Sequence, residues 1–139
     1  ALQAKVGLWV EPVNRYETHL LNHLDQAAAI VAPLAHPNLG IVADLFHMAL
    51  EETDIPAVLR ANRALITHVH LADSNRQLPG RGTSNFSAVM HALAEMDYIG
   101  WLSFECDQPG NNHDHAKQYM DTLPASIALV RQAFQGPGL

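Results

Sequence analysis

Four apolar segments of this chain each end in a side chain that can bind a metal ion, and segments of helical length separate them. They run from Val6 to Glu11, from Ile41 to Asp44, from Ile66 to His70 and from Leu102 to Glu105. When strands alternate with helices, the strands form a parallel sheet whose C-terminal strand ends lie at one edge. The pattern therefore predicts that two glutamates, one aspartate and one histidine meet at a single site.

Proline, glycine and polar residues divide the chain into four strand-helix units. We expect strands at 6–11, 41–44, 66–71 and 101–105, helices at 18–32, from Pro56, at 86–96 and at 116–134, and a flexible tail at 135–139. Asp44 should lead into a loop, 73–84 should be a long loop, and Ser84 or Asn85 should cap the helix that follows. Pro124 should kink the last helix.

Four parallel units fit either an open doubly wound sheet or half of an eight-stranded barrel. No Gly-x-Gly-x-x-Gly sequence follows the first strand, and no P-loop lysine pattern is present. The candidate ligand at every strand end favours the second alternative. The expected fold is α/β, a (β/α)4 half of a TIM barrel formed by residues 1–139 as one segment.

Composition narrows the classes of partner and compartment. With 48% hydrophobic and 16% charged residues, the chain has the composition of one globular domain. Its net charge of -6 and only eight Lys and Arg residues argue against nucleic acid and favour a small-molecule partner. Cys106 is the single cysteine, and neither a membrane span nor a signal peptide is apparent, so we expect a cytoplasmic protein without disulfides.

Oxygen ligands with one imidazole suit a hard divalent cation, Mn²⁺ best, with Co²⁺ or Mg²⁺ as alternatives. A single strand-end carboxylate is more often a helix cap or part of a surface ion pair than a metal ligand. Four candidate ligands at four strand ends of one chain are unlikely to arise by chance. His68 and His70 face the same side of their strand. His70 lies nearer the C-terminal end, so we expect it to be the ligand and His68 to be a hydrogen-bonded histidine of the inner layer.

Four sequence motifs point to a known family. They are Glu11-Pro-Val-Asn-Arg-Tyr-Glu17, Asp44-Leu-Phe-His47-Met with Glu51-Glu52, His70-Leu-Ala-Asp-Ser-Asn-Arg76 with Pro79-Gly-Arg-Gly82, and Ser103-Phe-Glu105. In this order and spacing they resemble the xylose isomerase-like TIM barrel superfamily of sugar and sugar phosphate isomerases and epimerases. More narrowly, they are similar to ketose 3-epimerases of the D-tagatose 3-epimerase and D-allulose (psicose) 3-epimerase type. The resemblance covers nearly the whole chain, but only the C-terminal half of such a barrel.

The resemblance implies a function for seven residues. It implies that Glu11 and Glu105 are catalytic acid/base groups and that Glu11, Asp44, His70 and Glu105 hold the divalent metal. It further implies contacts between the sugar and Glu17, His47 and Arg76. The implied reaction is a metal-dependent epimerisation through a cis-enediolate, in which one glutamate removes the C3 proton and the other returns it on the opposite face.

Three alternatives stay open at this point. Ala72-Asp73-Ser74 stands where such epimerases usually have Gly-Glu-Ala, and similar loops occur in hydroxypyruvate isomerase and in sugar phosphate isomerases, so an aldose-ketose isomerase is one alternative. A non-catalytic half-barrel that only binds metal or sugar is the second. A repair endonuclease of the abasic-site family is the third, and the acidic charge disfavours it. Since half a barrel exposes two strand edges, we also expect a homo-oligomer or the remainder of a longer chain as a partner.

Overall fold

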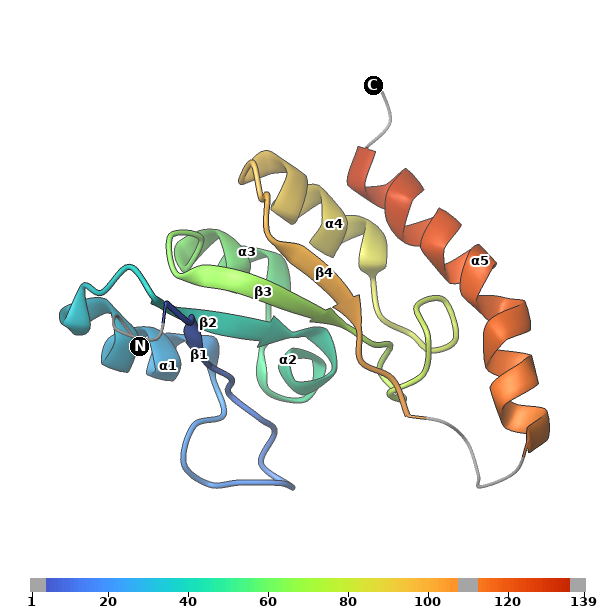
Figure 1. The fold of residues 1–139 in the computed structure, drawn as a ribbon, viewed down its shortest axis with the longest axis horizontal. Coiled ribbons are helices and arrows are strands. Elements are labelled where there is room, and N and C mark those ends of the chain that lie inside the picture. The colour runs from blue at the N-terminus through green and yellow to red at the C-terminus, as the bar shows by residue number, and fades with distance from the viewer. Residues whose placement is uncertain (1–4, 108–112, 136–139) are drawn as a thin grey trace.

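Four parallel strands form a sheet in which spatial order follows sequence order. The computed structural model describes residues 5–107 and 113–135, and its strands are β1 (Leu8–Val10), β2 (Leu39–Asp44), β3 (Ile66–Leu71) and β4 (Trp101–Phe104). Each pair of neighbouring strands is parallel. In Figure 1 the arrowheads of β2, β3 and β4 point to one edge, where the following loops gather. The predicted α/β fold with parallel strands is confirmed.

Helices follow every strand. They are α1 (Leu24–Val31), α2 (Leu45–Glu51), α3 (Ile55–Ala61), α4 (Phe86–Glu95) and α5 (His113–Gln135), with a 3₁₀ turn at Ala32–Leu34. Successive side chains of a strand point to opposite faces of the sheet. On β3, Val69 and Leu71 are fully buried in the hydrophobic core with the helices, whereas His68 and His70 are only partly buried. The histidines therefore lie on the face that the helices leave uncovered.

Two elements differ from the expectation. The helix predicted from Thr18 begins only at Leu24, because the side chain of Asn22 bonds the carbonyls of Val13 and Thr18 and the backbone N–H of Leu24 donates to Glu52. The loop predicted after Asp44 is instead helix α2, which starts at once because the carboxylate of Asp44 caps it. The predicted tail lies outside the described residues from position 136 onward, and Gln135 is the last residue of α5.

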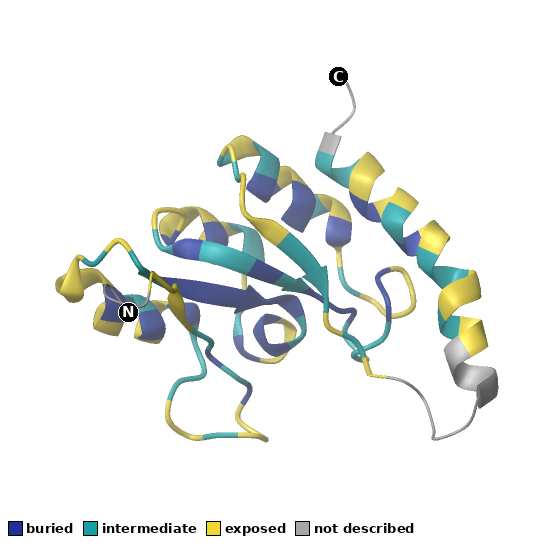
Figure 2. Ribbon diagram, viewed as in Figure 1, coloured by how far each residue is buried: buried dark blue, intermediate teal, exposed yellow. Residues whose placement is uncertain are grey.

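The two outer strands carry exposed apolar side chains. Figure 2 shows β2 buried along its length, while exposed segments lie along β1 and β4. Leu8 is 60% exposed and Trp101 75% exposed. Large apolar side chains at open sheet edges favour pairing with further strands, so the expected association stays a prediction with a physical basis. No helix within residues 5–107 and 113–135 combines the length and apolar character needed to cross a membrane.

An ion pair ties the loop after β1 to helix α2. The Arg15 guanidinium contacts the Glu51 carboxylate through Nη2 at 2.7 Å and Nε at 3.0 Å, and the Arg15 backbone N–H also donates to it. Glu51 is buried at this contact, while Arg15 is largely exposed. The side-chain and then the backbone hydrogen bonds from Arg15 lower the pKa of Glu51 from 4.5 to about 2.

This pair predicts a pH-dependent contribution to stability. A carboxyl group whose pKa is lowered by folding stabilises the protein above its unfolded pKa and loses this effect as the pH falls through the folded value. We expect Arg15→Met to lower the free energy of unfolding at pH 6, and the difference from the parent protein to shrink between about pH 4.5 and about pH 2. Urea unfolding at pH 6 and pH 3 measures this, with Arg63→Met as the matched control. An equal difference at both pH values would contradict the assignment.

Candidate functional site

The four candidate ligands converge at the C-terminal edge of the sheet. Glu11 follows β1, Asp44 ends β2, His70 lies near the end of β3 and Glu105 follows β4, and one ligand atom of each lies within 4.8 Å of all the others. Nδ1 of His70 is 3.1 Å from Oε1 of Glu11, 3.2 Å from Oε2 of Glu105 and 3.5 Å from Oδ2 of Asp44. The sheet register produces this convergence, because Asp44 pairs with His70 and His70 pairs with Ser103.

The carboxylate of Asp44 divides its two oxygens between the helix and the site. Oδ1 accepts the backbone N–H groups of Phe46 at 2.8 Å and His47 at 3.1 Å, which caps α2. Oδ2 is buried and has no hydrogen-bond partner among the described residues. A buried carboxylate oxygen without a partner is rare and costly, and a cation beside it would account for it. The donor set of three carboxylates and one imidazole therefore fits a hard divalent metal.

Burial and nearby negative charge both raise the pKa of Glu11. Burial, the largest cause, raises the pKa of Glu11, and the nearby carboxylates of Asp44 and Glu105 raise it further. His70 acts in the opposite direction and only partly offsets them. A divalent cation among these ligands would favour the ionised form of each carboxylate, which is the form that binds metal.

Asn14 fixes the proton position of His47. The backbone N–H of Asn14 donates to Nδ1 of His47 at 3.2 Å, so Nδ1 is unprotonated and the neutral ring carries its hydrogen on Nε2. Burial lowers the pKa of His47 although Glu17 opposes this, which favours the neutral ring. The Asn14 amide also donates to Oε1 of Glu17 at 2.9 Å. Asn14 therefore holds two of the predicted substrate-contacting side chains, a role that the sequence reading did not assign to it.

Arg76 completes this side of the site. Its Nη1 is 3.4 Å from Nε2 of His47, and because both are donors they cannot bond each other. Two N–H donors at this separation are suited to share one anionic oxygen. Nη2 donates to Oε2 of Glu105 at 3.2 Å, Nε is 3.5 Å from Asp107, and the guanidinium lies 4.6 Å above the ring of Phe46. Phe46 and Asp107 were also missed, although Phe46 stands inside the Asp44-Leu-Phe-His47-Met motif.

His68 lies on the same face of β3 but differs from the expectation. Its Nδ1 is buried and has no hydrogen-bond partner among the described residues, so the predicted hydrogen bond is absent at that nitrogen. Stacking holds the ring instead: Trp9 lies parallel to it at 5.4 Å between ring centroids, and His70 packs edge-on at 5.0 Å. Burial lowers the pKa of His68, so the neutral ring is favoured beneath the ligands.

Comparison with known proteins shows the family to which this sequence is similar. The family model described as xylose isomerase-like TIM barrel matches residues 1–125. A 3-dehydro-D-guloside 4-epimerase of Escherichia coli is 34% identical over 116 residues, which are 84% of this chain and 44% of that protein. A ketose 3-epimerase of Arthrobacter globiformis is 37% identical over 100 residues, 72% of this chain and 35% of that protein.

The fold is also found in the solved structure of a protein with a related sequence. The crystal structure of a 3-keto-D-glucoside 4-epimerase from E. coli superposes with a TM-score of 0.80 at 33% identity, over 94% of this chain and 48% of that chain. This chain thus spans less than half the length of the curated relatives above and about half of the solved barrel. The prediction of a half-barrel is confirmed.

Proposed function

Because the chain belongs to the xylose isomerase-like TIM barrel family, we propose that it is the metal-binding half of a ketose 3-epimerase. The observation that carries this proposal is the convergence of Glu11, Asp44, His70 and Glu105, where the buried Oδ2 of Asp44 accepts no hydrogen bond from the described residues. Relatives that share the matched segment are named as epimerases of ketoses and of keto-glycosides. These reactions all invert a carbon beside a carbonyl group.

Each side chain of the site has a part in the proposed reaction. Glu11, Asp44, His70 and Glu105 would hold a divalent cation, Mn²⁺ by preference, which polarises the substrate oxygens and acidifies the proton on the adjacent carbon. Glu11 and Glu105 come from opposite ends of the four-stranded sheet, which supports placing one on each face of the sugar. One glutamate takes the proton and the other delivers a proton to the opposite face, which inverts the configuration.

The remaining polar side chains orient the sugar and stabilise charge. The Nε2–H of His47 and the guanidinium of Arg76 are donors that converge on one place, and we assign them to the oxygen that gains negative charge when the proton leaves. Glu17, held by Asn14, accepts hydrogen bonds from sugar hydroxyl groups in this proposal. The tautomer of His47 matters here because only a protonated Nε2 can donate.

A second candidate function differs in substrate. The E. coli relative is a 4-epimerase of a 3-dehydro-guloside, which favours a keto-glycoside over a free ketose. The chemistry is the same, because C4 of a 3-keto sugar is also adjacent to the carbonyl. An aldose-ketose isomerase would need the proton returned to the neighbouring carbon on the same face, and the placement of the two glutamates does not favour it.

A substrate panel tests these functions. The intact protein, loaded with Mn²⁺, is incubated with ketohexoses, ketopentoses, their phosphates and 3-keto-glycosides, and the products are separated by chromatography. We expect inversion at the carbon beside the carbonyl in one of these classes, and metal analysis should give about one ion per site. An aldose product would favour the isomerase. Bound metal without any product would favour a non-catalytic metal-binding fragment.

A further inference from the structure

Asp73 lies outside the site described above, yet it is fully buried and charged. It stands in the loop between β3 and α4, where its carboxylate is surrounded by backbone N–H groups. Oδ1 accepts from Ser74 at 2.7 Å and Ser84 at 3.0 Å, and Oδ2 accepts from Gly80 at 2.9 Å and Arg81 at 3.0 Å. A single carboxylate thus joins both ends of an eleven-residue loop segment, since Ser84 is eleven positions from Asp73.

The loop is built to admit this carboxylate. A Cβ atom at Gly82 would lie 2.4 Å from Oδ1 of Asp73, so a side chain at that position would displace the carboxylate. Burial, the largest influence, would raise the pKa of Asp73, but hydrogen bonds from Ser84, Gly82 and Ser74 together outweigh it and lower the pKa. The ionised carboxylate is therefore the form that the loop holds. It satisfies the backbone N–H groups of Ser74, Gly80 and Ser84, while that of Arg81 also donates to the carbonyl of Leu78.

Arg76 lies within the same loop, and its backbone depends on Asp73. The backbone N–H of Arg76 donates to the carbonyl of Asp73 at 2.8 Å, and that of Asp73 donates to the carbonyl of Gln77 at 2.8 Å. Arg76 has a φ of +59°, a conformation that non-glycine residues adopt only when surrounding contacts impose it. Its carbonyl accepts from the backbone N–H of Asp107 at 2.7 Å, which links this turn to the segment after β4.

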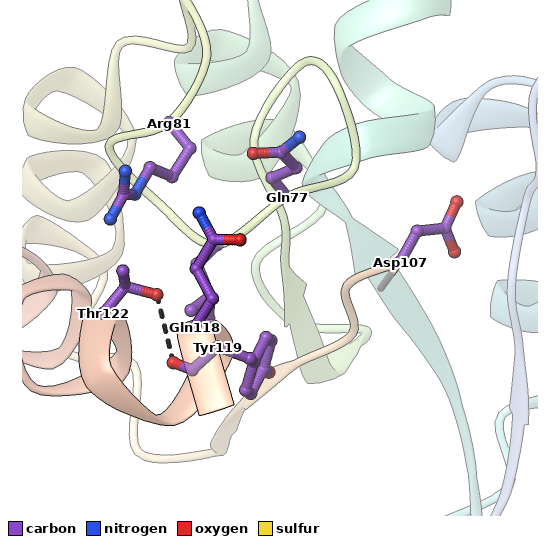
Figure 3. A pocket seen from close by; sticks show the side chains of 7 residues that line it. Gln77, Arg81, Asp107, Gln118, Tyr119 and Thr122 are labelled. Atoms are coloured by element: carbon purple, nitrogen blue, oxygen red, sulfur yellow. Dashed lines mark hydrogen bonds between the residues drawn. The ribbon is translucent and has the colours of Figure 1, made fainter. Parts of the chain in front are cut away.

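The outer side of the loop lines a pocket beside α5. Figure 3 shows Gln77 and Arg81 of the loop facing Gln118, Tyr119 and Thr122 of α5 across a pocket, with Asp107 at its far side. Packing is incomplete at this pocket, although Leu78 and Pro79 of the same loop are buried. The contacts of the Asp73 carboxylate restrain the turn that carries Arg76 from inside the loop, while on the α5 side the hydroxyl of Ser126 donates to the carbonyl of Pro79 at 2.8 Å.

We propose that Asp73 is a positioning residue. It holds Arg76 so that its guanidinium donates to Glu105 and lies beside Nε2 of His47. This inference rests on the proposed function for its effect on turnover, but not for its effect on the conformation of Arg76. The carboxylate does not touch the substrate position. It acts through the turn, because the two atoms of Arg76 that face the site are placed by a backbone conformation that the loop imposes.

A double-mutant cycle in the intact protein tests the proposal. Asp73→Asn keeps the shape of the side chain, but an amide nitrogen cannot accept the two N–H groups that now point at one carboxylate oxygen. We expect a 10- to 100-fold loss of kcat, about the range for residues that orient a metal-site group, with a smaller change in KM. Combined with Arg76→Ala, Asp73→Asn should cause almost no further loss. Asp54→Asn, an exposed helix cap, is the matched control that should leave kcat unchanged.

Two measurements keep the outcomes distinct. If Asp73→Asn lowers kcat by the same factor in the Arg76→Ala background, or if it leaves kcat unchanged, the proposal is overturned. If the parent protein turns over no substrate, the proposed function fails and the ¹⁵N NMR signal of the Arg76 Nε–H decides instead. That signal should shift in Asp73→Asn and not in Asp54→Asn, and an unshifted signal overturns the proposal. Should Asp73→Asn not fold, Gly82→Ala, which crowds the same carboxylate, takes its place in both measurements.

Discussion

A Glu105→Gln variant of the intact protein is expected to lose about 10²- to 10⁴-fold in kcat, the range that general acid-base catalysis contributes. The same loss is expected for Glu11→Gln. Glutamine retains the size of the side chain and can still place an oxygen near the metal, but it cannot take up a proton. Glu95→Gln, a matched change at an exposed ion pair with Arg60, should leave kcat unchanged.

Hydrogen exchange in D₂O separates the two glutamates. If each serves one face of the sugar, the variant that lacks one of them can still remove and return a proton on the other face. One epimer should therefore exchange its proton for deuterium without inversion, while the other epimer stays inert, and the two variants should show opposite preferences. Undiminished epimerisation by either variant, or exchange of both epimers, would contradict the assignment of one glutamate to each face.

The strand ends could be predicted from the sequence because their signals are local. Proline at position 12 and glycine at position 100 delimit apolar runs, and parallel topology then brings the residues after them together. The helix that follows Asp44 could not be predicted in this way, because it has only seven residues and no glycine or proline follows it before Pro56. In the sequence, ligand and helix cap were alternatives for a strand-end carboxylate. In the structure Asp44 caps that helix and also faces the site.

The contacts around His47 depend on tertiary structure. Asn14 reaches His47 across 33 positions of the sequence, and Arg76 reaches it across 29. Neither distance nor tautomer can be inferred from residue types, although Asn14 stands inside one of the motifs that identified the family. Helix α1 likewise begins at Leu24 because Glu52, from another segment, accepts the first N–H. Such long-range hydrogen bonds decide boundaries that local periodicity leaves open.

Metal binding should depend on Asp44 more than on the general negative charge of the site. In the intact protein, Mn²⁺ at 100 times its dissociation constant should raise the free energy of unfolding by about 2.7 kcal/mol. Asp44→Asn retains the Oδ1 acceptor that caps α2 but replaces the buried Oδ2, which accepts no hydrogen bond from residues 5–107 and 113–135, with an amide group. We expect this variant to gain little stability at the same Mn²⁺ concentration.

The metal-free comparison makes this test specific. Without metal, the carboxylates of Glu11, Asp44 and Glu105 repel one another. This repulsion adds to burial, the larger cause, in raising the pKa of Glu11. Asp44→Asn removes one of the three charges, so the metal-free variant should be at least as stable as the metal-free parent. Calorimetric titration with Mn²⁺ and thermal unfolding with and without chelator measure both effects, with Asp54→Asn as the control. Equal stabilisation of Asp44→Asn and the parent by Mn²⁺ would exclude Asp44 as a ligand, because an amide in place of the buried carboxylate cannot bind a hard cation as strongly.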